Sequence, residues 1–252
     1  MNAAWRAWVA TNLKRKCNRF DMLRQMTTDG VPPDEAEAAL QLPSMPLRPH
    51  SFALRNAQIR LFCLKRFLTP EQCGELCFLI AQKRRPSTVA DGGRPGDRTS
   101  TTCDMYLGQH RIVDEVDARI CARMGFLSTE AEVLQGQHYE VGQQFRRHVD
   151  YFEHPASDEV HAVRGGRTWT FMVYLTAVDE GGETEFTKLG LTFRPEPGMA
   201  LVWCNLDQSG QPNPLTEHCA HPIVRGTKVI LTKWFREIPA AEVRVDRHGR
   251  RS

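Results

Sequence analysis

The stretch Gln143-Gln-Phe-Arg-Arg-His-Val-Asp-Tyr-Phe152 contains an H-x-D pair, formed by His148 and Asp150. In an extended strand, side chains two positions apart point to the same side. The imidazole and the carboxylate would then converge on one point. A neutral imidazole together with a carboxylate suits a divalent metal of intermediate hardness. Because many proteins contain such a pair by chance in a surface strand, the residues around it decide what it means.

Two ligands rarely hold a metal alone, and the candidate third ligand is His218, in Thr216-Glu-His-Cys-Ala-His-Pro222. Two histidines and one carboxylate on one face leave the other coordination positions open, which is the arrangement of non-haem Fe(II) oxygenases. We therefore predict that His148, Asp150 and His218 bind iron. The adjacent Cys219 is expected to be a small buried residue or an oxidation-sensitive thiol, with metal coordination as the alternative.

The residues around these positions form a longer pattern. Tyr139 and Gly142 precede the H-x-D pair, a Gly-Gly-Glu-Thr-Glu-Phe run occupies 181–186, and Lys228 follows His218. This pattern resembles the prolyl 4-hydroxylase-like branch of the 2-oxoglutarate/Fe(II) dioxygenases, over roughly residues 58–237. Other matching positions are Arg167, Thr170, Tyr174, Leu175, Pro195, Gly198, Pro222, Gly226 and Trp234, with an upstream echo at Arg98, Thr99 and Ser100, whereas Ile223 and Thr176 replace a Val and an Asn of the family.

The resemblance implies a distorted double-stranded β-helix, or jelly roll, with helices packed outside it. It also implies Fe(II) as the metal, 2-oxoglutarate and O2 as co-substrates, and ascorbate as a possible reductant. The reaction would hydroxylate an unactivated C–H bond, by default in a prolyl residue of a peptide or protein, while 2-oxoglutarate becomes succinate and CO2. Family halogenases carry a small residue in place of the carboxylate, so Asp150 favours hydroxylation, and desaturation stays open.

Strand alternation places Lys228 on one face with Ile230, Thr232 and Trp234. A lysine on an inward face needs an anionic partner, because an unpaired buried ammonium costs several kcal/mol. The resemblance assigns this partner to the far carboxylate of 2-oxoglutarate, with the Tyr139 hydroxyl as a second donor. The alternative for Lys228 is a solvent-exposed strand end, and for Tyr139 a place in the core. Thr184 would either donate to the co-substrate or only shape its turn.

Three further residues are candidates for substrate binding. Arg167 and Trp234 match family positions that face a peptide, and Arg98 lies in a segment, Lys83 to Ser100, that is rich in Arg, Gly, Pro and Ser. We predict this segment to be a mobile loop over the substrate, although a merely solvated loop fits as well. A surface ion pair for Arg167 and core packing for Trp234 are the structural alternatives.

The bulk composition is that of an ordinary globular protein, with 252 residues, 41% hydrophobic residues and 25% charged residues. A net charge of +3 gives no case for a nucleic-acid partner. No apolar run approaches the ~20 residues needed to span a bilayer, so we predict no membrane partner. The eight cysteines form no C-x-x-C pair, and we interpret them as reduced thiols of a cytoplasmic protein.

The chain divides by pattern into three parts. Residues 1–49 predict a small helical module and a Pro-rich linker, 50–238 the jelly-roll domain, and 239–252 a basic flexible tail. The module would either dock a partner or, as we favour, support the main domain. The fold class is therefore α+β, mainly β. Within it we expect helices at 69–81 and 111–124, and strands at 55–69, 133–141, 167–177, 198–204 and 228–235.

The leading function from the sequence is a 2-oxoglutarate-dependent dioxygenase that acts on prolyl residues. A hydroxylase or desaturase of a free amino acid or small metabolite is the enzymatic alternative. A jelly-roll binding module with a structural metal is the non-enzymatic one, and a different jelly-roll metalloenzyme would have no need for Lys228. The oligomeric state is left open.

Overall fold

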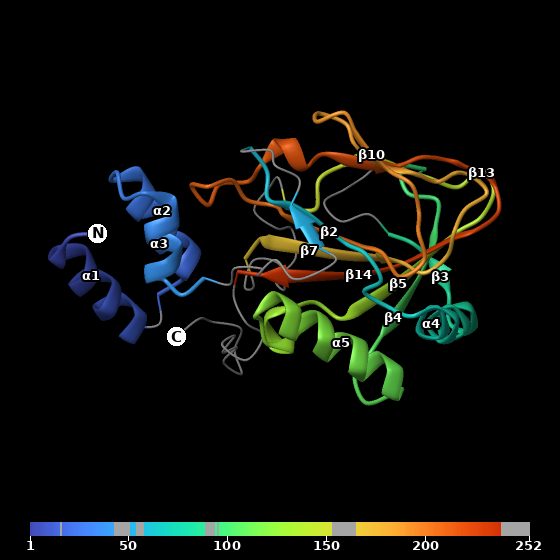
Figure 1. The fold of residues 1–252 in the computed structure, drawn as a ribbon, viewed down its shortest axis with the longest axis horizontal. Coiled ribbons are helices and arrows are strands. Elements are labelled where there is room, and N and C mark those ends of the chain that lie inside the picture. Colours follow the sequence, from blue (N-terminus) through green and yellow to red (C-terminus); the bar gives the residue numbers. More distant parts are fainter. Residues whose placement is uncertain are drawn as a thin grey trace.

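Two facing antiparallel sheets form the centre of the protein. The structure is a computed structural model that describes residues 1–15, 17–42, 51–53, 58–88, 94, 96–152 and 165–237. Within them the larger sheet has eight strands in the order β1-β2-β11-β7-β14-β5-β4-β3, and the smaller has four in the order β10-β9-β12-β6. Figure 1 shows the smaller sheet across one face of the larger one, as expected for a jelly roll.

The strands are short apart from the two at the centre of the larger sheet, β7 (Arg167–Tyr174) and β14 (Lys228–Arg236). The other strands of this sheet are β1 (Ser51–Ala53), β2 (Leu61–Leu64), β3 (Arg85–Pro86), β4 (Thr101–Met105), β5 (Leu134–Tyr139) and β11 (Ala200–Cys204). The smaller sheet contains β6 (Phe145–His148), β9 (Thr184–Phe186), β10 (Leu191–Phe193) and β12 (His218–Ala220), and a separate pair is made by β8 (Glu180–Gly181) and β13 (Ile223–Arg225).

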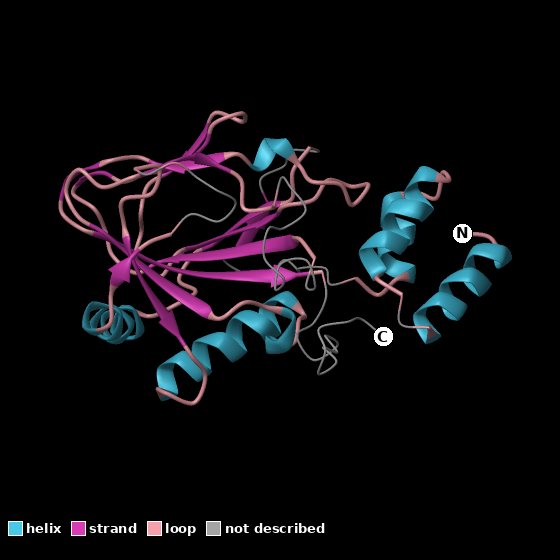
Figure 2. Cartoon of the chain, turned by 180° about the vertical axis from the view of Figure 1, so that it is seen from behind, coloured by secondary structure: helices cyan, strands magenta, loops and turns pink. Residues whose placement is uncertain are grey.

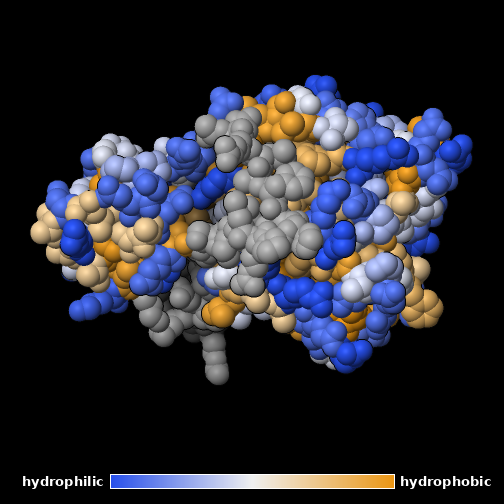
Figure 3. Space-filling view, viewed as in Figure 1, coloured by the Kyte–Doolittle hydropathy of each residue, from blue (hydrophilic) through white to orange (hydrophobic). Residues whose placement is uncertain are grey.

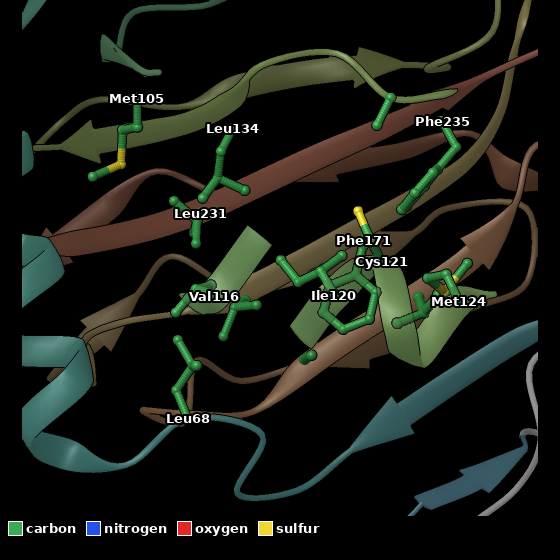
Figure 4. Close-up of a cluster of buried hydrophobic side chains, with 14 of the residues drawn as sticks. Leu68, Met105, Val116, Ile120, Cys121, Met124, Leu134, Phe171, Leu231 and Phe235 are labelled. Carbon is green, nitrogen blue, oxygen red and sulfur yellow. The ribbon is translucent and has the colours of Figure 1, made fainter. Parts of the chain in front are cut away.

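Two helices, α4 (Pro70–Gln82) and α5 (Arg111–Met124), cover the other face of the larger sheet (Figures 1 and 2). The helix expected over 69–81 is present as α4, and it begins with a capping box in which Thr69 and Gln72 exchange side-chain and backbone hydrogen bonds. Figure 4 shows the apolar face of α5 against the strands, where Val116, Ile120 and Met124 meet Phe171 and Leu231. This interface is the main core of the domain.

Strand β7 divides its side chains between two cores, as its alternation predicts. Trp169, Phe171 and Val173 face the helices, whereas Met172 and Tyr174 face the smaller sheet. Both faces of this strand are thus covered, and every residue from Thr168 to Tyr174 is buried. The second core, between the sheets, is the one that borders the H-x-D pair.

The predicted N-terminal helices are present as α1 (Ala3–Lys14), α2 (Arg19–Thr28) and α3 (Pro33–Ala39). They share a small core of their own, yet Phe20 of α2 packs into the main core. Arg60 pairs with Glu37 at 2.6 Å, and Arg24 donates to the carbonyl of Gly210 at 3.1 Å, so the helices contact the main domain. The predicted linker at 42–49, apart from Leu42, and the predicted tail at 239–252 lie outside the described residues.

Two sequence-based expectations about loops and strands need correction. The segment predicted as a loop from Lys83 to Ser100 contains β3, and Arg98 forms a bridge with Phe145 that extends the edge of the smaller sheet. Of the segment expected as a strand over 55–69, the described residues from 58 onward contain the strand β2, and β1 was not foreseen. In the described part of the chain, no helix is long and apolar enough to cross a membrane. Hydrophilic residues intermixed with smaller hydrophobic areas cover the face shown in Figure 3.

Candidate active site

The two halves of the candidate metal site come from neighbouring strands. Strands β6 and β12 pair so that His148 lies opposite His218, and Asp150 follows two residues after the end of β6. The ring centroids of the histidines are 4.2 Å apart, and His148 Nε2 lies 3.8 Å from Asp150 Oδ1. One donor atom from each of the three residues lies within 4.8 Å of the other two. The structure therefore brings together the three residues predicted from sequence.

Hydrogen bonds fix the orientation of each of these side chains. The Nδ1 atoms of His148 and His218 lie 2.8 Å and 2.9 Å from the backbone carbonyl oxygens of Arg146 and Thr216. Since a carbonyl only accepts, each Nδ1 carries the proton and each Nε2 keeps its lone pair for a ligand. The imidazole of His148 is also stacked against the ring of Phe145, with centroids 3.5 Å apart.

A buried chain of donors holds the carboxylate. Thr170 Oγ1 donates to Asp150 Oδ2 at 2.7 Å, and Asn205 Nδ2 donates to Thr170 Oγ1 at 3.0 Å. Burial by itself would raise the pKa of Asp150, but the nearby imidazoles and this hydrogen bond hold it below its usual value. Burial lowers the pKa of His148, and the neighbouring His218 lowers it further. The site is thus held as neutral imidazole beside carboxylate, the protonation state that binds a metal.

The anchor predicted for a dicarboxylate lies at the deep end of the same cleft. Lys228 is fully buried, and its Nζ donates to Thr184 Oγ1 at 3.4 Å. Its ammonium lies 5.6 Å from the ring centroids of both Tyr139 and Tyr174. Tyr139 is the cross-strand partner of Lys228 and donates its hydroxyl to Gln137 at 3.2 Å. The alternative of a solvent-exposed lysine at the strand end is wrong.

Burial lowers the pKa of Lys228 from 10.5 to about 7, although Glu183 counteracts part of this shift. Among the described residues, no carboxylate oxygen lies within 4.0 Å of its Nζ. A buried ammonium with a single long hydrogen bond is unfavourable, because its desolvation is not compensated. The cleft therefore provides a strong cationic site for an anion that the protein does not itself supply.

The cleft has an empty volume of about 390 Å³, and Lys228 and Trp234 line it from opposite ends of β14. The end at Trp234 is called its outer end here. Arg167 lies over the ring of Trp234 at 4.0 Å and makes two hydrogen bonds of 2.7 Å with Glu132. Arg98 lies over Phe145 at 5.1 Å and donates to Gln135 at 3.2 Å. Arg167 and Trp234 are thus brought together at the outer end of the cleft, whereas Arg98 reaches the site through Phe145.

Comparisons with known proteins agree with this arrangement. Residues 134–236 match the family model described as "2OG-Fe(II) oxygenase superfamily". "Prolyl 4-hydroxylase 2" of Arabidopsis thaliana is 30% identical over 220 residues, covering 77% of this chain and 72% of the relative. "Prolyl 4-hydroxylase 5" of the same plant is 34% identical over 195 residues, covering 67% and 65%. The chain belongs to the 2-oxoglutarate/Fe(II)-dependent oxygenase superfamily, in its prolyl 4-hydroxylase-like branch.

Solved structures show the same fold at lower identity. The viral collagen prolyl hydroxylase of Paramecium bursaria Chlorella virus-1, in complex with 2-oxoglutarate, has 24% identity and a TM-score of 0.57, over 70% of this chain and 95% of that one. A prolyl-4-hydroxylase of Pseudomonas putida has 21% identity and a TM-score of 0.51, over 70% and 92%. The predicted jelly-roll fold is confirmed.

The residues fit the groups that this superfamily uses, which are Fe(II), 2-oxoglutarate and O2. Two imidazole nitrogens and one carboxylate oxygen form a donor set for a ferrous ion and leave positions open for a chelating ligand. The unpaired ammonium of Lys228 fits the far carboxylate of a dicarboxylate. When bound, the iron supplies the oxidising chemistry, and the protein supplies binding, orientation and shape.

Several residues of the site carry weak signals or none in the sequence. Thr170 and Tyr174 belong to the family pattern, but the pattern does not say that Thr170 holds Asp150 or that Tyr174 faces Lys228. Asn205 follows the last residue of β11 and has no motif around it. Its distance of 35 residues from Thr170 hides their hydrogen bond from any local pattern.

Proposed function

We propose that this protein is a 2-oxoglutarate- and Fe(II)-dependent dioxygenase that hydroxylates prolyl residues in a peptide or protein. The observation that carries the proposal is the distribution of chemistry along one cleft. The His148, Asp150 and His218 donors lie beside a fully buried ammonium at one end and a cation–aromatic surface at the other. The names of the Arabidopsis thaliana relatives support prolyl residues as the substrate class.

In this proposal His148, Asp150 and His218 bind the iron, and each has one fixed donor atom free for it. Lys228 pairs with the far carboxylate of 2-oxoglutarate, and Thr184 and Tyr139 offer hydroxyl groups nearby. The aromatic and aliphatic walls of the cleft exclude water from this end, which strengthens the charge pair. Ascorbate would act as the external reductant.

The outer end of the cleft has the character of a peptide-binding surface. Trp234 is largely buried, and its indole Nε1 has no hydrogen-bond partner among the described residues. This nitrogen is itself covered by protein atoms, so Trp234 offers a substrate its aromatic ring rather than its N–H. Arg167 is held against this ring by Glu132, and its guanidinium also lies over the ring of Phe152 at 5.1 Å. Arg98, stacked on Phe145, would complete the substrate side.

The test is a panel of proline-containing peptides, free L-proline and other free amino acids, incubated with Fe(II), 2-oxoglutarate and ascorbate. We expect a peptide to gain one oxygen atom on a proline, with succinate formed in equal amount, and we expect no change in the matched peptide with alanine at that position. Oxygen incorporation into free L-proline alone would move the substrate class to small molecules. If none of the reactions forms succinate, the proposal that the protein is an enzyme is refuted.

A further inference from the structure

A second group of metal-ligand side chains lies on the outer surface of the smaller sheet. Glu185, Cys219 and His221 each place one donor atom within 4.8 Å of the other two. His221 Nε2 lies 2.8 Å from Glu185 Oε2, and Cys219 Sγ lies 4.0 Å from both atoms. These residues have no part in the pattern shared with the superfamily.

Strand alternation explains why these residues meet. Phe186, next to Glu185, packs between the sheets, and so does the imidazole of His218, next to Cys219. Side chains of consecutive strand residues point to opposite faces, so Glu185 and Cys219 point outward. They are direct cross-strand partners in β9 and β12, and His221 is held near them by a backbone hydrogen bond to Glu183.

We propose that Glu185, Cys219 and His221 form a second metal site, for a zinc ion or a similar thiol-binding divalent cation. Zinc accepts thiolate, imidazole and carboxylate together, whereas a harder cation would not select a site with sulfur. Zinc displaces the thiol proton of Cys219 to the solvent when the Zn–S bond forms. The carboxylate and the thiolate then balance the charge of the ion.

The spacing of the donors agrees with one tetrahedral ion. With the usual Zn–S, Zn–N and Zn–O bond lengths, tetrahedral geometry separates sulfur from the other two donors by about 3.5 Å and nitrogen from oxygen by about 3.3 Å. The observed separations of 4.0 Å and 2.8 Å differ from these values by amounts that side-chain rotation covers. The hydrogen bond between His221 and Glu185 would break, and both side chains would bind the ion instead.

The surroundings leave the fourth coordination position accessible. Cys219 and His221 line an open outer hollow, and the side chains of His221 and Glu185 are 41% and 28% exposed. A water molecule can therefore complete the coordination sphere, as in zinc sites with three protein ligands. Because Cys219 directly follows His218, an ion here would tie β9 and β12 together behind the iron site.

Cobalt(II) substitution distinguishes this site from the iron site, because only this one contains sulfur. Added to the metal-free full-length protein, Co(II) should give a near-ultraviolet thiolate-to-cobalt charge-transfer band, which Zn(II) should abolish. The band should persist in Asp150→Asn, which alters the iron site, and in Cys17→Ser, which removes an exposed thiol elsewhere. It should be lost in Cys219→Ser.

The exposed ligands give a second measurement that does not depend on the folding of the cysteine variant. Glu185→Gln and His221→Asn should each weaken Co(II) binding at this band by about tenfold or more. The absence of a thiolate band in the wild-type protein, its persistence in Cys219→Ser, or unchanged affinity in both surface variants would overturn the proposal. None of these results depends on whether the chain hydroxylates a peptide.

Discussion

The buried ammonium of Lys228 predicts that 2-oxoglutarate binding weakens as the pH rises. In the free protein, burial lowers the pKa of this lysine to about 7. A bound carboxylate favours the charged form and raises that pKa, so binding takes up a proton near neutral pH. The carboxylates of the ligand do not titrate in this range. Above neutral pH, the fraction of Lys228 in the charged form that the ligand requires therefore decreases.

The size of the effect follows from this pKa. Between about pH 6.5 and about pH 8.5 the charged fraction of Lys228 falls about 25-fold. The dissociation constant of 2-oxoglutarate rises by the same factor, which is a loss of about 2 kcal/mol of binding free energy. The stability of the ligand-free protein changes in the opposite sense. The folded pKa lies below the unfolded value of 10.5, so the unfolded chain binds more protons and stability rises with pH through this window.

Calorimetric titration of the Mn(II)-substituted protein with 2-oxoglutarate measures the dissociation constant without turnover. Oxalate, which can chelate the metal but lacks the far carboxylate, is the matched ligand and should show little pH dependence. Lys228→Met keeps the length of the side chain and should bind 2-oxoglutarate weakly at every pH. A flat profile for the wild type, or the same slope in Lys228→Met, would refute the account of the anchor.

Three other perturbations test the packing around the site. Thr170→Val removes the donor to Asp150 and should weaken Fe(II) binding roughly 10- to 100-fold in a chelator competition, while Thr170→Ser should retain most of the affinity. Glu132→Gln leaves the buried Arg236 and the partly buried Arg167 without their carboxylate and should lower the free energy of unfolding by about 3–5 kcal/mol. These arginines hold the pKa of Glu132 at about 2 against the effect of burial, so the wild type should lose this stabilisation only as the pH falls below the usual pKa of a glutamate. If Glu132→Gln lost stability at low pH as steeply as the wild type, the stabilising role of the Glu132 carboxylate would be contradicted. A Cβ at Gly136 would lie 2.3 Å from Ile80, so Gly136→Ala should destabilise the protein by about 1–3 kcal/mol by thermal denaturation, and combination with Ile80→Val should recover part of the loss if crowding is the cause.

Local patterns predicted the elements whose signals lie within a few residues. The helix expected over 69–81 and the alternation of β7 agree with the structure, because both depend on neighbours in the chain. The segment from Lys83 to Ser100 was interpreted as a loop because it has no such local signal. Its strand β3 has two exposed residues, and the bridge of Arg98 to Phe145 adds a single isolated pair at a sheet edge. Polar edge strands carry no hydrophobic period by which to find them.

The same difference between local signals and long-range contacts applies to the candidate site. The H-x-D pair was found from its spacing and Lys228 from the family pattern, but the partners that orient them were not found. Asn205 supports Asp150 through Thr170, and Glu132 holds Arg167 across 35 residues, so neither partner has a local signature. Such supports depend on which strands become neighbours, and that is decided by the whole fold rather than by a motif.

The short strand β12 contributes residues to the iron site on one face of the smaller sheet and to the outer cluster on the other face. The side chain of His218 enters the cleft beside His148, whereas the next residue, Cys219, pairs across the outer face with Glu185. A change of one residue in register would exchange the two faces and place a thiol in the iron site. The regular pairing of β12 with β9 fixes this register and places Cys219 opposite Glu185. The pairing of β12 with β6, which is irregular between His218 and Ala220, places His218 opposite His148, so β12 connects the iron ligands to the outer cluster.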